Sequence, residues 1–290
     1  MSPSIAKTIG EYIAAESFSR LPPEVIHKSR LCVLDSIGCL LGAINLPVSR
    51  MMQNFTGDLA VGHGVGLLDP AVAAFRTATL INALDFDDIY EKGHPGATVI
   101  AAALSMAAQR QCSGADFLEA VIAGYEVSCR IGISLLHRTS RKTLHGHGTW
   151  QVFGATAAAA KLMRLDAGQA AQAIAIAAVN APVASVMKTV YGKKPSMAKN
   201  NFGAAAQTGV NAARLAAAGF EGPLDVFEGE TGFWRMAGAD ECDFGRLTRA
   251  FGSTYEIFKI GFKHGLSRAA CRRAATSSQW RELMLRPAST

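Results

Sequence analysis

The sequence has few charged residues, no closely paired cysteines and no long stretch of alternating polar and apolar residues. Charged residues make up 18% of its 290 positions, against 49% hydrophobic residues, so the chain can bury a large core. Its six cysteines include no CxxC pair and mostly have apolar neighbours, as in Leu31-Cys32-Val33. This usage favours reduced core thiols over a disulfide or zinc framework, and no metal is expected.

Strand-length alternation of Val and Ile with polar residues is rare, which counts against a β-sandwich or barrel. The longest hydrophobic stretches are rich in alanine and broken by polar residues, so no membrane span is expected. The first ten residues lack an apolar segment behind a basic start, so no signal peptide is visible. We therefore expect a soluble, cytoplasmic protein.

The net charge of +6 is unevenly placed. Five arginines and one glutamate follow His264, so residues 1–263 carry only about +2. A nearly neutral body with a basic end is not the charge pattern of a nucleic-acid-binding domain, and no nucleic acid is expected as a partner. No GxGxxG, GxxxxGK[ST] or GxSxG motif occurs, so the sequence has no cofactor fingerprint and no cofactor is expected.

Alanine is abundant, in blocks such as 157–160 and 204–206. Because alanine is the best helix former and permits close helix packing, we predict an all-α fold. Residues 1–250 are expected to form one helical domain, and residues 251–290 the start of a second domain with a disordered basic tail. Helices are predicted at 5–15, 23–42, 71–85, 97–110, 117–136, 151–163, 167–179 and 203–218, with Asp166 as an N-cap.

The first polar loop, residues 82–96, has three aspartates within four positions: Asp85, Asp87 and Asp88. Their mutual repulsion predicts a raised pKa for one of them, or a cation nearby. His94 precedes a Pro-Gly pair that would hold it in a stiff turn. A solvated acidic loop with a capping histidine is the alternative interpretation.

Two further loops also lead into helices rich in small residues. The second contains His145 and His147, separated by one glycine. Two histidines are too few for a zinc site, whereas a histidine before a helix N-terminus suits anion binding or proton transfer. The third contains Lys193, Lys194 and Lys199. These lysines beside a helix N-terminus suit an anionic ligand, although simple solvated lysines would also account for them.

At these same loops the sequence resembles the MmgE/PrpD family, which includes 2-methylcitrate dehydratase, cis-aconitate decarboxylase and iminodisuccinate epimerase. The matching segments occur in the family's order and at about its spacing over residues 4–263. They are Ala83-Leu84-Asp85-Phe86-Asp87-Asp88, His94-Pro95-Gly96, Gly124-Tyr125-Glu126-Val127, Arg130-Ile131-Gly132, His145 ahead of Phe153-Gly154-Ala155, Ala157-Ala158-Ala159-Ala160-Lys161 and Gly203-Ala204-Ala205-Ala206-Gln207.

The resemblance implies a large helical domain, a smaller α/β lid domain, a homodimer and a site for a small polycarboxylic acid. The catalytic residues carried over by motif are Asp85, His94, His145, Lys199 and Lys263. Lys199 lies one residue nearer Gly203 than is common in the family, so Lys194 is a rival, and Asp88 and His147 are further candidates for substrate binding. Ile89 stands where many members carry threonine, which leaves the exact substrate contacts open.

The reaction implied by the resemblance is cofactor-free dehydration of 2-methylcitrate or a similar acid, as in propionate metabolism. In this hypothesis His94 and His145 transfer protons, Lys199 and Lys263 hold carboxylates, and Asp85 orients a histidine. Decarboxylation or epimerisation of a related acid could use the same groups.

Beyond Lys263 the sequence no longer resembles the family. Members continue into the lid domain, whereas here an arginine-rich stretch ends at Thr290. This composition predicts a C-terminally truncated member with most of the lid missing. Without a cover the site would be open to water, and apolar surface would be exposed. An inactive family remnant that binds a partner or a carboxylic acid is therefore the alternative to an active lyase.

Overall fold

The structure is a computed structural model, and it describes residues 4–57, 68–91, 93–135, 144–145, 148–182, 185–186 and 201–263. Within these residues the fold is all-α, as predicted, apart from one short pair of strands. Strand β1 (Leu144–His145) pairs antiparallel with β2 (Ser185–Val186). The longer helices are α1 (Ile5–Ala15), α2 (Pro23–Ala43), α3 (Pro47–Thr56), α4 (Pro70–Ile81), α5 (Pro95–Arg110), α6 (Gly114–Leu135), α7 (Val152–Leu162), α8 (Ala167–Val179) and α10 (Phe202–Ala217).

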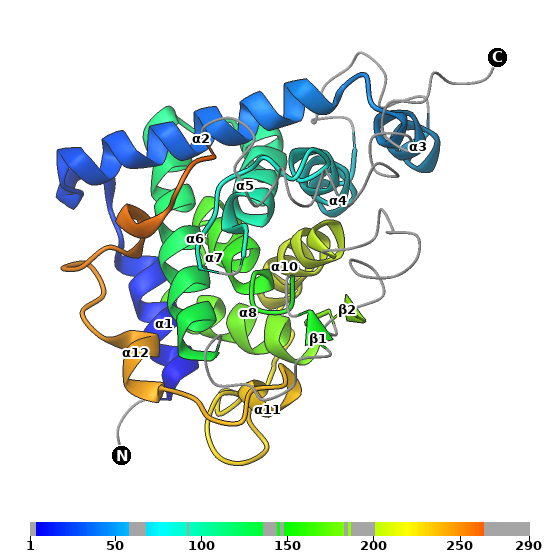
Figure 1. Cartoon of the computed structure of the whole chain (residues 1–290). Coiled ribbons are helices and arrows are strands. Elements are labelled where there is room, and N and C mark those ends of the chain that lie inside the picture. Colours follow the sequence, from blue (N-terminus) through cyan, green and yellow to red (C-terminus); the bar gives the residue numbers. More distant parts are fainter. Residues whose placement is uncertain are drawn as a thin grey trace.

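The core is built from helices whose small residues let their backbones approach closely. Helices α5, α6, α7, α8 and α10 lie in the middle of the molecule, with α2 lying across one end of the group (Figure 1). At the crossing of α6 and α7, a Cβ atom on Gly124 would lie 2.8 Å from the carbonyl oxygen of Gly154. Glycine and alanine at such crossings bring the helices together, and this packing buries most of α6 and every residue of α7 except Lys161.

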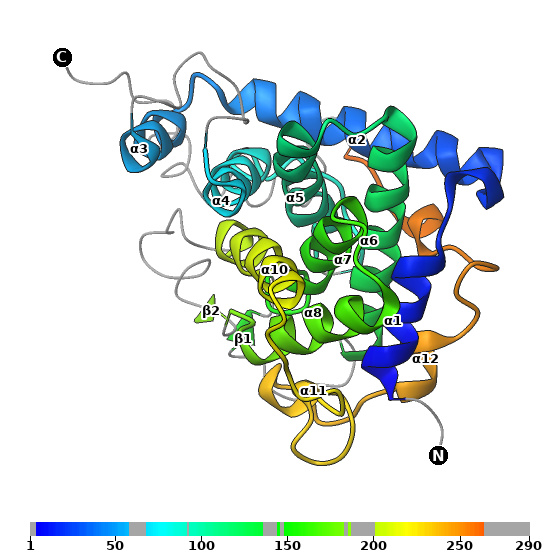
Figure 2. The ribbon, with the colours of Figure 1, turned by 180° about the vertical axis from the view of Figure 1, so that it is seen from behind.

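The last part of the described chain runs back over the outside of this core. Helices α11 (Phe233–Met236) and α12 (Phe244–Thr248) are short, and a 3₁₀ turn (Glu256–Lys259) comes after them. From the other side of the molecule, this segment is seen to run from α12 towards α2 (Figure 2). It ends beside the connection between α4 and α5, because Ile89 and Gly261 exchange two backbone hydrogen bonds of 2.9 Å.

The predicted helices match the observed ones closely where local signals were strong. Helix α8 has the predicted bounds, and Asp166 caps it within a complete capping box with Gln169. Helix α4 ends at Ile81, four residues before the predicted end. Helix α3 was missed, although Pro47 begins it. The predicted disordered tail, residues 264–290, lies outside the described residues.

Two expectations concern the surface: that no helix spans a membrane, and that apolar side chains are exposed. Among the described helices, none is long and apolar enough to cross a membrane alone. Helices α2 and α3 pass that test only as a pair, which is bent by 92°. The outer face of α2 carries apolar side chains that are more than half exposed, notably Leu34 at 66% and Leu41 at 60%.

Candidate active site

The connection between α4 and α5 forms the candidate site, and its aspartates lie in different environments. Asp85 has a left-handed backbone (φ 52°) and a side chain that is 29% exposed. Asp87 and Asp88 are completely buried. Burial raises the pKa of Asp87 well above its usual range and that of Asp88 to about 7. Mutual repulsion was predicted to raise the pKa of one aspartate; the pKa is raised at two of them, and loss of solvent is the largest cause at both.

His94 is held at the start of α5 by the preceding loop. Its Nδ1 atom lies 2.8 Å from the backbone oxygen of Asp88. A carbonyl oxygen only accepts hydrogen bonds, so Nδ1 must carry the hydrogen, and in the neutral imidazole Nε2 keeps a lone pair. Nε2 lies 3.6 Å from Oδ1 of Asp85. The proton-accepting atom of His94 therefore faces the partly exposed aspartate.

Lys263 reaches this site from the far end of the described chain. Its ammonium group donates a hydrogen bond of 2.6 Å to the backbone oxygen of Asp85 and lies 3.6 Å from Oδ1 of the same residue. The cation predicted near the aspartates is therefore present. Three of the predicted catalytic residues, Asp85, His94 and Lys263, meet at one point although 178 positions separate Asp85 from Lys263.

A metal ion was not expected here, and the donor set fits one poorly. Donor atoms of Asp85, Asp87 and His94 lie within 4.8 Å of one another, close enough to surround an ion. However, Nδ1 of His94 is used by the Asp88 carbonyl, and the Lys263 ammonium already places a positive charge 3.6 Å from Asp85. An added cation would be repelled by this ammonium, so the site disfavours a metal ion.

The other predicted residues fall in or beside segments outside the described residues. His145 lies in β1, but its side chain is not among those described, and His147, Lys194 and Lys199 are outside as well. Residues that come shortly after these segments do reach the first loop. The ring of Phe202, which begins α10, contacts His94 edge-on at 5.8 Å between centroids. Trp150 leaves no room for a Cβ atom on Gly93.

Several residues of the site were missed by sequence reasoning. Asn82 donates a 2.8 Å hydrogen bond to buried Asp87, and Tyr125 of α6 donates a 2.6 Å bond to Asp88. Asp35 of α2 lies close enough to Asp88 for the backbone N–H of Asp88 to favour its ionised form, although burial raises the pKa of Asp35. Tyr125 lies in a segment that carried the family resemblance, which was a usable signal. Asp35 gave none, because it lies within an ordinary helical pattern.

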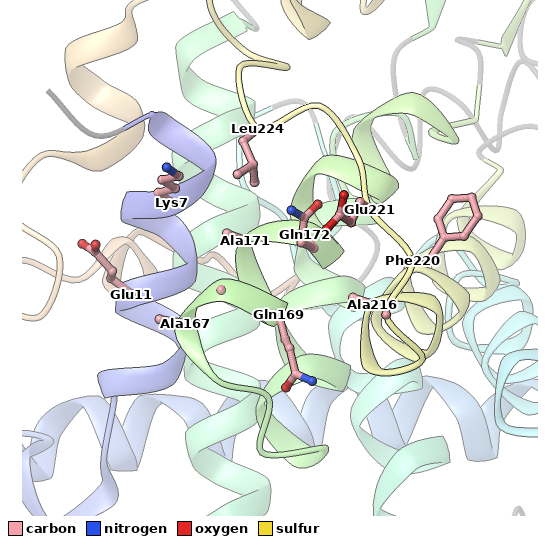
Figure 3. A pocket seen from close by; sticks show the side chains of 12 residues that line it. Lys7, Glu11, Ala167, Gln169, Ala171, Gln172, Ala216, Phe220, Glu221 and Leu224 are labelled. Atoms are coloured by element: carbon pink, nitrogen blue, oxygen red, sulfur yellow. The ribbon is translucent and has the colours of Figure 1, made fainter. Parts of the chain in front are cut away.

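A pocket of about 420 Å³ lies elsewhere, between α1, α8 and the chain that leaves α10 (Figure 3). Its lining includes Lys7, Glu11 and Phe220. The pocket adjoins the C-terminal end of α10, whereas Phe202, which contacts His94, begins that helix. The 16 residues of α10 span about 24 Å at 1.5 Å per residue, so the pocket is separate from the candidate site.

Comparison with known proteins identifies the family to which the chain belongs. The MmgE/PrpD N-terminal domain matches residues 7–243. Cis-aconitate decarboxylase of Homo sapiens is 30% identical over 250 residues, which cover 80% of this chain and 50% of the human protein. The enzyme of the same name from Mus musculus is 27% identical over 246 residues, covering 80% of this chain and 49% of the mouse protein.

A mitochondrial 2-methylcitrate dehydratase of Yarrowia lipolytica is 26% identical over 264 residues, which cover 82% of this chain and 49% of the yeast protein. The chain thus spans about half the length of the curated relatives it matches. The matched domain covers most of the sequence and includes the loop that carries Asp85 and His94. This chain belongs to the MmgE/PrpD family.

Proposed function

We propose that this chain carries the acid–base half of a cofactor-free lyase site for a citrate-like polycarboxylic acid. The observation that carries the proposal is the meeting of Asp85, His94 and Lys263, with the lone pair of His94 Nε2 facing Asp85. A neutral imidazole in this tautomer accepts a proton through Nε2. An ammonium beside it stabilises negative charge that develops on a substrate carboxylate.

Two reactions of such acids fit these groups. In dehydration, His94 takes the proton from a carbon next to a carboxylate, and hydroxide leaves from the neighbouring carbon with a proton from a second acid. In decarboxylation, a carboxylate leaves as carbon dioxide and its bonding electrons take a proton from the protonated imidazole. Dehydration of 2-methylcitrate was the expectation from sequence. The names of the human and mouse relatives favour testing cis-aconitate decarboxylation equally.

The remaining cations that bind the carboxylates of the substrate are expected to come from further residues. Within the described site, burial keeps protons on Asp87, which lowers the negative charge that a polycarboxylate would meet. His145, Lys199 and its rival Lys194 remain candidates for the remaining cations, and His147 for a substrate contact. A homodimer and a cytoplasmic location likewise remain proposals.

The proposal is tested by offering the purified chain 2-methylcitrate, citrate and cis-aconitate separately. Loss of water is monitored by the absorbance of the new double bond, and loss of carbon dioxide by its capture. We expect turnover of at least one acid, reduced about 10²- to 10⁴-fold in kcat by His94→Gln. His27→Gln, which changes an exposed histidine of α2, is the matched control and should leave turnover unchanged.

A folded chain that turns over none of the three acids would contradict the lyase proposal and favour the inactive-remnant alternative. Titration calorimetry with the same acids separates these cases further. A remnant that keeps the site binds an acid without converting it, and Lys263→Met should weaken that binding. Binding to DNA that persists at about 200 mM salt would instead support a nucleic-acid function.

A further inference from the structure

Asp88 is hydrogen-bonded through both carboxylate oxygens and its backbone oxygen, to helices α5 and α6 and to His94. Its backbone N–H favours the ionised form of the Asp35 carboxyl on α2. Its carboxylate accepts from the hydroxyl of Tyr125 on α6 at 2.6 Å and from the backbone N–H of Gly96 on α5 at 3.0 Å. Its backbone oxygen accepts from Nδ1 of His94. Asp88 therefore fixes the loop, the start of α5 and the imidazole together.

The packing around this junction allows little movement. Tyr125 and Asp88 are both fully buried. A Cβ atom on Gly96 would lie 2.7 Å from the Tyr125 hydroxyl and 2.8 Å from Oδ2 of Asp88. His94, the N-cap residue of α5, makes no capping bond with its side chain, so the Asp88 carboxylate serves the free N–H at this helix end.

We propose that Tyr125 and Asp88 are positioning residues that hold His94 in the Nδ1–H tautomer, with the lone pair on Nε2. Tyr125 fixes the Asp88 carboxylate, the carboxylate fixes the loop backbone, and the backbone oxygen of Asp88 fixes the imidazole. A side chain that acts on a catalytic histidine through such a contact affects its orientation and tautomer. The consequence for turnover rests on the proposed function, whereas the tautomer of His94 does not.

This role differs from the substrate contact that sequence suggested for Asp88. Both carboxylate oxygens already accept hydrogen bonds inside the protein, and the residue has no exposed surface. A buried carboxylate with partners on both oxygens would have to give one up to reach a ligand. Asp88 is therefore placed to orient His94 and not to bind the substrate.

The test reads the two ring nitrogens of His94 by long-range ¹H–¹⁵N NMR of the full chain labelled in histidine, with His94→Gln to assign the signals. The variant Tyr125→Phe removes only the hydroxyl. Tyr12→Phe is the control, because it removes a hydroxyl from another buried tyrosine, on α1 and stacked on Phe251. Asp88→Asn keeps the side-chain shape and one accepting oxygen. Circular dichroism checks that each variant is folded.

We expect the neutral His94 of the native chain to show a protonated Nδ1 and an unprotonated Nε2. Tyr125→Phe should shift both signals towards a mixture of tautomers, and Tyr12→Phe should leave them unchanged. If a substrate acid is turned over, Tyr125→Phe should lower kcat by about 10- to 100-fold with little change in KM. Asp88→Asn should keep the tautomer and most of the activity, because its amide can still accept from Gly96 and donate to Tyr125.

Three results would overturn the proposal. The first is a native His94 protonated on Nε2 when neutral, which is decisive even if Tyr125→Phe does not fold. The second is a Tyr125→Phe spectrum identical to the native one. The third is an Asp88→Asn chain with the native tautomer but a strongly raised KM, which would return Asp88 to substrate binding. None of the spectra depends on turnover, so a failed lyase proposal is distinguishable from a failed positioning proposal.

Discussion

Asp85, Asp87 and Asp88 lie within four positions, and their different burial gives these chemically identical side chains different contacts. Asp85 keeps contact with water and faces His94 and Lys263. Asp87 and Asp88 lose all solvent and keep protons to higher pH, Asp88 with a pKa of about 7. Electrostatic repulsion alone would not say which aspartate remains ionised, because the answer depends on solvent access at each position.

Gly96 is predicted to be hard to replace, because it lies at the crowded junction between Asp88 and Tyr125. Gly96→Ala would place a Cβ atom 2.7 Å from the Tyr125 hydroxyl and 2.8 Å from Oδ2 of Asp88. Both side chains are fully buried, so neither has room to move. We expect a loss of about 1–3 kcal/mol in the free energy of unfolding, the usual range for overpacking. Urea unfolding monitored by circular dichroism measures it.

The matched control is Gly38→Ala in the middle of α2, where an added Cβ meets nothing within 4 Å. Because alanine is the better helix former, this change should stabilise the chain by up to about 1 kcal/mol. Equal effects of the two substitutions would show that helix propensity, and not the crowded junction, governs Gly96.

At the scale of elements, a buried ion pair on α6 anchors the returning segment that delivers Lys263. Glu126 accepts a 3.0 Å hydrogen bond from the backbone N–H of Ile257 and lies 3.3 Å from Arg130. Arg130 in turn donates to the backbone oxygens of Thr254, at 2.7 Å, and Arg249. These contacts hold an irregular segment against a regular helix, and so determine where Lys263 lies.

Arg130→Ala should therefore release residues 249–263 from α6. Above about pH 7, where Glu126 is ionised, breaking the buried pair leaves Glu126 without its cation, and the expected cost is about 3–5 kcal/mol in the free energy of unfolding. Hydrogen exchange should show lost protection at Ile257 and its neighbours. For comparison, Arg214→Ala breaks an exposed pair with Asp69 and should cost less than about 1 kcal/mol. Unchanged protection in Arg130→Ala would contradict this anchoring role.

The whole molecule is expected to lose stability as the pH rises towards neutrality. Burial raises the pKa of both Asp88 and Glu126 to about 7, and it also raises that of Asp87. The unfolded chain releases these protons near pH 4, whereas the folded chain keeps them. The stabilisation is therefore complete below about pH 4 and is lost as the pH rises through about 7.

The free energy of unfolding should accordingly fall between about pH 5 and pH 7, measured by urea unfolding at a series of pH values. Glu126→Gln removes one of the titrating groups and should make the fall shallower by about one proton. Glu11→Gln changes an exposed glutamate of α1 and should not alter the slope. A stability that rises over this window, or a slope equal in both variants, would show that the buried carboxyls do not control it.

Residue patterns were enough to predict the helical fold, the longer helices apart from α3, and the loop that forms the candidate site. Alanine content and the Asp166 cap act through neighbouring residues, so they can be recognised without knowing the fold. The choice among Asp85, Asp87 and Asp88, and the roles of Asp35 and Tyr125, emerged only in the folded molecule. They depend on burial and on contacts between α2, α5 and α6, which no local pattern encodes. Asp85 and Lys263 are 178 positions apart, and they meet because the segment before Lys263 packs on Glu126 and Arg130. That packing exists only once the chain has folded.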